Sequence, residues 1–553
     1  MKERFLLRCI ASITLIFALT ACSDASKKMS DLLEHVPSDA EVVFVGNIKA
    51  IVESSGGSIE ESRLRLPSYV DDMIGRSDSE LISFLELSGV DMDAFAFFGD
   101  TDESNIVTLF SLLDKDKFIN AIEDERFREK DVEDGVSYYV KKVDDDYDIY
   151  SYIAVSGDYA YSISDVWEIS DFDAMKKLRR SIEDANDRPF ADTKFCDFIT
   201  NSNLAGGSIK IPADAKREFR RAGFGSEIDD LLEGVVCFNS EITDNSLNVK
   251  VKLLDVNGDE IDTSALYKHF DSTAKINPTA LAYLGENDIM VCGVSMKDYD
   301  WDYYFDEFGE AVNMSRSDMA VLTIVKSYLE KFDGTILVGV GLTNGKESIY
   351  KLGLDDVEDD IMNELSFTVV METKTGKAKG IINDLKSLLD AQGLYYENAE
   401  SGFVLKFPDW NASIYVKAEN DMIIMSNSDI DARDGNATVD NIKFENYFAA
   451  AGLVLGKQNK LFEDFNLDEE LEVSLTYDLA ALEMTIDFMV ESDGSKGLIE
   501  TVANALIDDI IPEAERISER WIEYYDSRYD AVPYDSSDDS YYDWGEDSVA
   551  VVE

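Results

Sequence analysis

The sequence predicts an α+β protein made by tandem duplication, in which each unit has a curved antiparallel sheet and packed helices. Residues 108–165 and 368–429 both follow the order strand, short polar turn, helix, strand, strand, turn and strand. The strands are inferred from alternating β-branched and aromatic residues, and the turns from Gly157-Asp158 and Asn420-Asp421. Matches in one order at a nearly constant offset indicate an internal repeat. Two unrelated α+β domains with similar strand patterns are the alternative.

The similarity continues downstream of these two stretches. "TKFCDFITNSN" from Thr193 matches "IKFENYFAAAG" from Ile442, and each is followed by a strand, a tight turn and a second strand. We therefore expect repeat units at residues 36–254 and 276–490, joined by a polar linker at 255–275. Each unit is expected to open with a strand that follows a proline, at Pro37 and at Pro278.

The chain after the second unit divides into two parts. Residues 491–525 are expected to form amphipathic helices, because Leu498, Val502, Leu506 and Ile510 recur on one helical face. This face should dock on the sheet of a unit. Residues 526–553 hold nine acidic residues and one arginine, so they are expected to form a disordered acidic tail.

The N-terminus has the pattern of an export signal. Residues 1–21 combine a basic start with a short apolar segment, and Leu19-Thr20-Ala21 then precede Cys22 as in a bacterial lipoprotein box. Cys22 is therefore the expected site of lipidation by palmitate or a similar acyl chain, and residues 22–35 are the expected tether. An ordinary secretory leader with a chance cysteine is the alternative. The expected location is the outer membrane, with the periplasmic or surface face left undecided.

Charge limits the class of partner. The chain has 113 acidic and 51 basic residues, for a formal net charge of −62. Such a charge repels nucleic acid and anionic membrane surfaces, so neither is an expected partner. The partners that remain are the membrane, through the lipid anchor, and another protein of the cell envelope.

The sequence offers no catalytic residue and no cofactor motif. His35 and His269 are the two histidines, and neither has the spacing of zinc ligands. A serine hydrolase would need one of them, but the sequence has no G-x-S-x-G nucleophile motif. Cys196, Cys237 and Cys292 stand in apolar contexts typical of buried thiols, although one disulfide among the three is left open. The pattern favours a protein that is not an enzyme.

Two acidic features of the sequence are candidate sites. Asp255, Asn257 and Asp259 occupy the first, third and fifth places of a calcium-type loop, but Glu260 stands where that loop needs glycine. The stretch is therefore a weak calcium candidate and more typical of a turn. Carboxylate pairs for glycoside hydrolysis, from stretches such as residues 142–150 and 354–360, also stay open. Acidic residues are so abundant that such pairs carry little weight.

The lipoprotein box, the stretch "VPSDAEVVFVGNIKAI" and the two α+β copies together resemble an uncharacterised family of Bacteroidetes cell-envelope lipoproteins. That family is defined by a domain of unknown function. The resemblance implies location in the cell envelope and provides no catalytic or binding residues.

We expect an outer-membrane-anchored lipoprotein with a non-enzymatic binding or scaffolding role, exerted through the sheet faces or a cleft between the units. One alternative is a carrier of an apolar ligand or lipid. Its cavity would be lined by aromatic residues of the first unit: Phe95, Phe97, Phe98, Tyr152 and Tyr161. A glycan-acting hydrolase that uses carboxylates is a further alternative.

Overall fold

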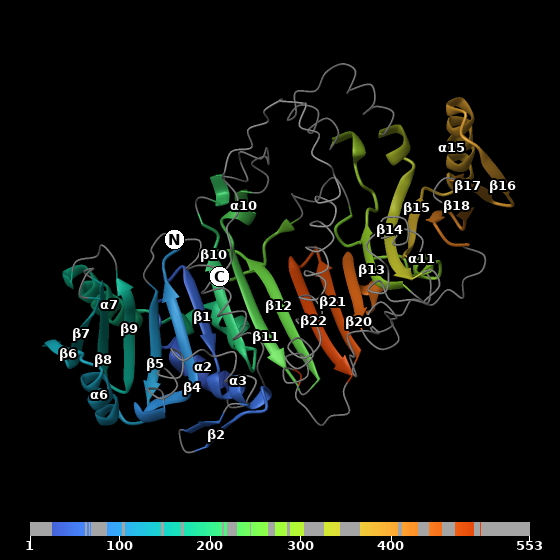
Figure 1. Ribbon diagram of the computed structural model, residues 1–553. Helices are drawn as coiled ribbons and strands as arrows, with labels where there is room; N and C mark the ends of the chain where they lie inside the picture. The colour runs from blue at the N-terminus through green and yellow to red at the C-terminus, as the bar shows by residue number, and fades with distance from the viewer. Residues whose placement is uncertain are drawn as a thin grey trace, which may run out of the picture.

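The computed structural model combines one large antiparallel sheet with several helices (Figure 1). It describes residues 25–60, 63–65, 67, 86–101, 106–144, 149–166, 171–212, 215–217, 229–243, 245–263, 271–284, 288–303, 326–342, 365–407, 412–429, 442–455, 470–491 and 498.

The first half of the chain supplies ten strands of this sheet and most of the described helices. Its strands are β1 (Val42–Gly46), β4 (Val90–Gly99), β5 (Val107–Leu112), β6 (Arg128–Glu133), β7 (Val136–Asp144), β8 (Ile149–Ser156), β9 (Tyr159–Val166), β10 (Ala205–Lys210), β11 (Val235–Ile242) and β12 (Ser246–Leu254). Its helices are α2 (Ala25–Leu33), α3 (Ile48–Ser54), α6 (Lys115–Asp124), α7 (Asp171–Asp187), α8 (Lys194–Thr200) and α10 (Asp229–Leu232). A separate small hairpin joins β2 (Ser58–Glu60) and β3 (Arg63–Arg65).

The second half supplies the other ten strands. They are β13 (Asp288–Ser295), β14 (Phe332–Leu342), β15 (Leu365–Thr373), β16 (Tyr396–Ala399), β17 (Gly402–Phe407), β18 (Ala412–Glu419), β19 (Met422–Ser426), β20 (Ala449–Leu455), β21 (Glu470–Asp478) and β22 (Glu483–Glu491). The helices described here are α11 (Pro278–Leu281) and α15 (Ala378–Gln392).

The two halves meet where β12 pairs with β22, and we call this pairing the seam. Seven residue pairs cross it, from Ser246 opposite Met489 to Lys252 opposite Glu483. Outward from the seam, one side runs β12-β11-β10-β1-β4-β5-β9-β8-β7-β6. The other side runs β22-β21-β20-β13-β14-β15-β19-β18-β17-β16. The order of strands along the chain is the same on both sides.

The hairpin turns lie where the sequence places them. Gly157 has φ 58° between β8 and β9, and Asn420 and Asp421 have φ 48° and 61° between β18 and β19. Glycine, asparagine and aspartate tolerate this left-handed backbone, which two-residue hairpins require. Strands β6 and β16 were not expected. They lie at the two ends of the strand order, and every residue of β6 is exposed, so no alternation marks it.

The expected tether is wrong over most of its length. Ala25–Leu33 form helix α2, and Met29 and Leu33 are fully buried in the largest hydrophobic core. Lys28 also pairs with the buried Asp91 at 2.7 Å. Apolar residues at helical spacing within the polar stretch explain this packing, because they cover the sheet through one face of the helix.

The expected strand after Pro278 is also wrong. Pro278 opens the short helix α11, and the Asn277 side chain caps it by accepting from the Thr279 N–H at 3.0 Å. An asparagine cap followed by proline favours a helix start. The strand that opens the second half is β13, which begins ten residues later at Asp288.

Several expectations concern parts of the chain outside the described residues. These are the signal at 1–21, Cys22, residues 264–270 of the linker, the helices at 491–525 apart from Glu491 and Leu498, and the tail at 526–553. Within the described part, no helix is long and apolar enough to cross a membrane.

A candidate apolar binding face

The register of the sheet defines two faces at the seam. Side chains alternate between faces along a strand, and directly opposed residues share a face. One face, which we call the core face, passes from Val45 through Asn239 and Thr476 to Leu337, and the buried side chains of the two main cores lie on it.

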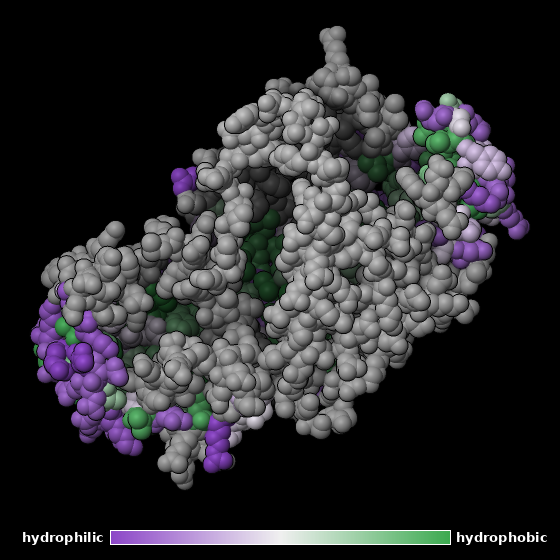
Figure 2. All heavy atoms as spheres, in the orientation of Figure 1, coloured by the Kyte–Doolittle hydropathy of each residue, from purple (hydrophilic) through white to green (hydrophobic). Residues whose placement is uncertain are grey.

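The opposite face is apolar across the whole seam, and we call it the open face. Ile242 and Val490 point to this side but are buried, at 0% and 4% exposed. We define the open face by thirteen other apolar side chains of β11, β12, β22, β21 and β20 that point away from the core face and are half-buried or exposed. They are Val236, Phe238, Leu247, Val249, Val251, Leu253, Met484, Ile486, Phe488, Val473, Leu475, Tyr477 and Leu453. Figure 2 shows hydrophobic atoms gathered in the middle of the molecule, over the region of β12 in Figure 1.

Burial and polarity are reversed between the two faces of β21. Glu472, Ser474 and Thr476 are buried on the core face, whereas Leu475 on the open face is 39% exposed. A soluble protein ordinarily buries its apolar strand face, because transfer of apolar surface out of water is favourable. An apolar patch that extends over several strands indicates an interaction site.

Helices bound the open face toward both ends of the sheet. Helix α6 packs through Phe118 and Ile122 against the outer strands of the first half, and α15 packs through Ile381 and Ile382 against those of the second. By register, their contacts lie on the same side of the sheet as the open face. The open face of the central strands therefore lies between these two helices.

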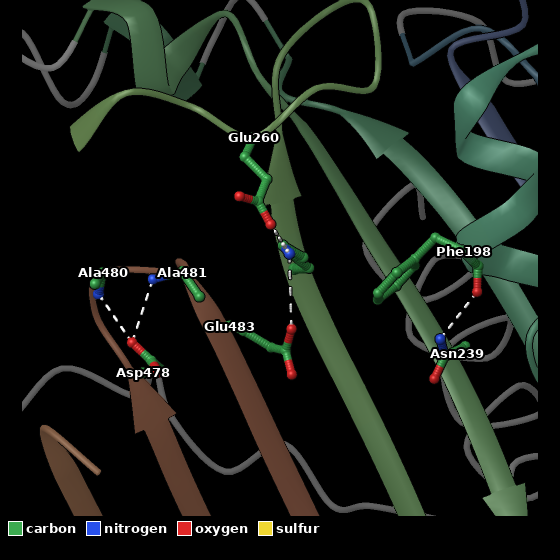
Figure 3. Close-up of polar contacts among 8 residues, drawn as sticks. Phe198, Asn239, Glu260, Asp478, Ala480, Ala481 and Glu483 are labelled. Atoms are coloured by element: carbon green, nitrogen blue, oxygen red, sulfur yellow. Dashed lines mark hydrogen bonds and ion pairs between the residues drawn. The ribbon is translucent and has the colours of Figure 1, made fainter. Parts of the chain in front are cut away.

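Polar contacts hold the core face of the seam. Lys252 lies between Glu260 at 2.7 Å and Glu483 at 3.8 Å, so one lysine bridges both halves (Figure 3). Asn248 also donates to Asp487 across the seam. Asn239, which is 2% exposed, donates through its amide to the Phe198 carbonyl oxygen at 2.9 Å. These contacts separate the two main cores with a polar strip, while the opposite side of β12 and β22 is apolar along the whole pairing.

The structure divides the aromatic residues proposed to line a carrier cavity between the two faces. Phe98, Tyr152 and Tyr161 are almost fully buried in the main core of the first half. Phe95 and Phe97 lie on the other side of the sheet, in a cluster with Phe44. The five side chains therefore do not line one cavity.

A hollow lies on the core-face side of the sheet, between α7 and the ends of β1 and β4. It has a volume of about 380 Å³. Its charged lining residues are Asp39, Asp100, Asp184, Lys176, Lys177 and Arg180. Three cationic and three anionic side chains balance one another, so the hollow has no charge preference for a ligand.

The weak calcium candidate forms a local turn. The carboxylate of Asp255 accepts from the N–H groups of Asn257 at 2.8 Å and Asp259 at 2.7 Å. Burial opposes ionisation of Asp255, but these hydrogen bonds outweigh it and lower the pKa. Asp259 pairs with Lys194, so its carboxylate is engaged elsewhere. Among the described residues, no three His, Cys, Asp or Glu side chains are grouped to hold a metal ion.

Cys196, Cys237 and Cys292, the cysteines in the described part of the chain, are free thiols. Cys196 and Cys237 are buried, and burial raises the pKa of Cys237 to about 12. Cys292, on the open-face side of β13, is half-buried, and burial raises its pKa as well. His35 packs on the ring of Tyr159, and burial lowers its pKa. His269, Asp145 to Asp148 and residues 354–360 lie outside the described residues.

Sequence reasoning missed the open face as a site, although it identified the strands that form it. The signal was present in "SLNVKVKLL" and "EMTIDFMVE", which alternate apolar and polar residues. Alternation alone does not say which face is covered.

Comparisons with known proteins add little to this geometry. No family model matches the chain, and no curated protein matches it. Among solved structures, crystal form IV of TP0453 is similar over 42% of this chain and 83% of its own, with 15% identity and a TM-score of 0.25. Crystal form III of TP0453 covers 41% of this chain and 80% of its own, with 15% identity and a TM-score of 0.25.

Proposed function

We propose that this chain is a lipid-anchored protein of the bacterial outer membrane with a non-enzymatic binding role, exerted through the open face. The observation that carries the proposal is the half-exposed apolar open face on five strands, together with the polar residues Glu472, Ser474 and Thr476 that are buried on the other side of β21. The occupant is a partner of matching chemistry: an apolar surface of another envelope protein.

A tandem duplication is part of this proposal. Its support is the identical strand order on both sides of the seam, together with the matched turns at Gly157 and Asn420. A duplicated unit whose last strand is an apolar edge can pair with its own copy. The seam, and with it the open face, would then arise directly from the duplication.

The position of α2 sharpens the anchoring proposal. If Cys22 carries the lipid, only Ser23 and Asp24 separate it from the helix that begins at Ala25. Three residue steps span about 10 Å at full extension. The first half of the protein would therefore sit against the membrane surface, within the proposed cell-envelope setting of the Bacteroidetes lipoproteins that the sequence resembles.

A carrier of an apolar ligand is the second candidate. The apolar open face, which lies between α6 and α15, favours it. The carrier differs from the leading proposal in its occupant: a lipid in place of a protein surface.

The anchor is tested by labelling cells with an alkyne-bearing palmitate. We expect label on the full chain and none on the Cys22→Ser variant, which should also leave the outer-membrane fraction. Label retained by Cys22→Ser, or an unlabelled parent in the soluble fraction, would refute lipidation at this residue.

The binding surface is tested with a photo-cross-linking amino acid in living cells. Leu475 is 39% exposed on the open face, and the matched control Val132 is 58% exposed on the distant edge strand β6. We expect a defined adduct from position 475 and none from position 132. A protein adduct supports the leading proposal, a lipid adduct supports the carrier, and equal labelling at both positions contradicts both.

A further inference from the structure

Leu498 is the described residue that follows β22 in the chain. It is 4% exposed, although it belongs to the segment expected to form an amphipathic helix. It packs in a cluster with Phe44, Phe95, Ile242 and Val490. Leu498 therefore lies against the sheet, seven residues beyond the end of β22 at Glu491.

This cluster lies on the open-face side of the sheet. Ile242 stands opposite Leu247, which is an open-face residue, and Val490 stands on the same side of β22 as Phe488. Phe238 and Leu247 of the open face pack against the same cluster. Leu498 therefore packs next to the open face.

The sequence from Leu498 onward has an apolar pattern that would fit the apolar open face. Leu498, Val502, Leu506 and Ile510 recur every four residues, which places them along one side of a helix. Asn504 falls on the opposite side. We propose that residues 498–510 dock on the open face as an amphipathic helix. The chain's own C-terminal segment is then the resident occupant of the surface that the proposed function assigns to a partner, and the inference rests on that function.

The consequence is competition between the segment and the partner. A segment joined by a short connection acts at an effective concentration on the order of millimolar. A partner must displace the segment. The apparent affinity of the partner is therefore its intrinsic affinity multiplied by the fraction of molecules in which the open face is uncovered. The segment also protects an exposed apolar surface from aggregation when no partner is present.

The first test measures binding of the neutral apolar dye Nile red to residues 23–553, which contain every described element. The Val502→Asp/Leu506→Asp variant places two carboxylates on the docking side. The control, Thr501→Asp/Asn504→Asp, adds the same charge away from it. We expect about tenfold tighter dye binding for the first variant and no change for the control. Measurable dye binding of equal affinity in the first variant and the parent would overturn the proposal.

The second test does not depend on the dye. In a Cys292→Ser background, Leu247→Cys is combined with Val502→Cys or, as control, with Asn504→Cys. We expect oxidation to join positions 247 and 502 in high yield and positions 247 and 504 poorly. Equal yields would overturn the docking. A selective cross-link, in a chain whose open face binds no dye even in the aspartate variant, would uphold the docking and refute the proposed function.

Discussion

The two faces of the sheet at the seam differ in what they bury. The core face buries Asn239, Ser474 and Thr476 and holds its charges in pairs, whereas the open face leaves Leu475 39% exposed and its neighbours half-exposed. Fully burying one such apolar side chain stabilises by about 1.5–3 kcal/mol. The polar contacts of the core face therefore fix how the strands pair, and further burial of the open face by a partner would be favourable.

The largest expected difference between the faces is in thiol reactivity. Cys237 is fully buried on the core face with a pKa raised to about 12, while Cys292 on the open-face side is half-buried. Modification of Cys237 requires unfolding, so Cys292 should react at least about a thousandfold faster with a thiol reagent. The check is labelling at pH 8 with peptide mass mapping, and Cys292→Ser is the control. Equal rates would break the comparison.

Truncation of a core side chain should have the next largest effect. Leu33 of α2 is 0% exposed, and Leu33→Ala should lower the free energy of unfolding by about 3 kcal/mol, since it leaves a cavity. Leu475→Ala on the open face should cost less than about 1 kcal/mol. Urea unfolding measures both. A larger loss for Leu475→Ala would mean that the open face is a core.

Removal of a buried polar contact comes third. Asn239→Ala leaves the Phe198 carbonyl without its donor and should cost about 1–2 kcal/mol. Asn446, which is exposed, provides the matched Asn446→Ala control, with little expected change. The same urea unfolding experiment compares the two variants. An unchanged free energy of unfolding for Asn239→Ala would show that this buried contact of the core face does not stabilise the protein.

A polar contact at the rim of the sheet should have the smallest effect. Thr101 donates to the Glu41 carboxylate from its hydroxyl at 2.6 Å and its N–H at 3.0 Å, and these bonds lower the pKa of Glu41. A lowered folded-state pKa stabilises the protein above the unfolded pKa, and this contribution is lost as the pH falls through the folded value. Thr101→Val should therefore cost a few tenths of a kcal/mol near pH 7, and less near pH 3. Unfolding at both pH values measures the difference, and a larger loss at the lower pH would contradict the assignment.

The sequence by itself determined the repeated pattern of strands, turns and helix in the two halves and its order. Alternating strands, the turns at Gly157 and Asn420 and the helix at Ala378–Gln392 follow from local patterns, because side-chain period and turn chemistry act within a few residues. It did not reveal β6 or the start of α11 at Pro278, where exposure or a cap replaced the apolar pattern.

Only the tertiary structure decided how these elements combine. The pairing of β12 with β22 joins strands more than two hundred residues apart in the chain, and α2 enters the core although its sequence resembles a polar tether. Alternation gives each strand one apolar side, but whether that side meets another layer depends on contacts between distant segments. The open face exists because α2, α7 and α8 pack on the other side of the first half and α6 and α15 pack on the outer strands, which leaves the apolar side of the central strands half-exposed.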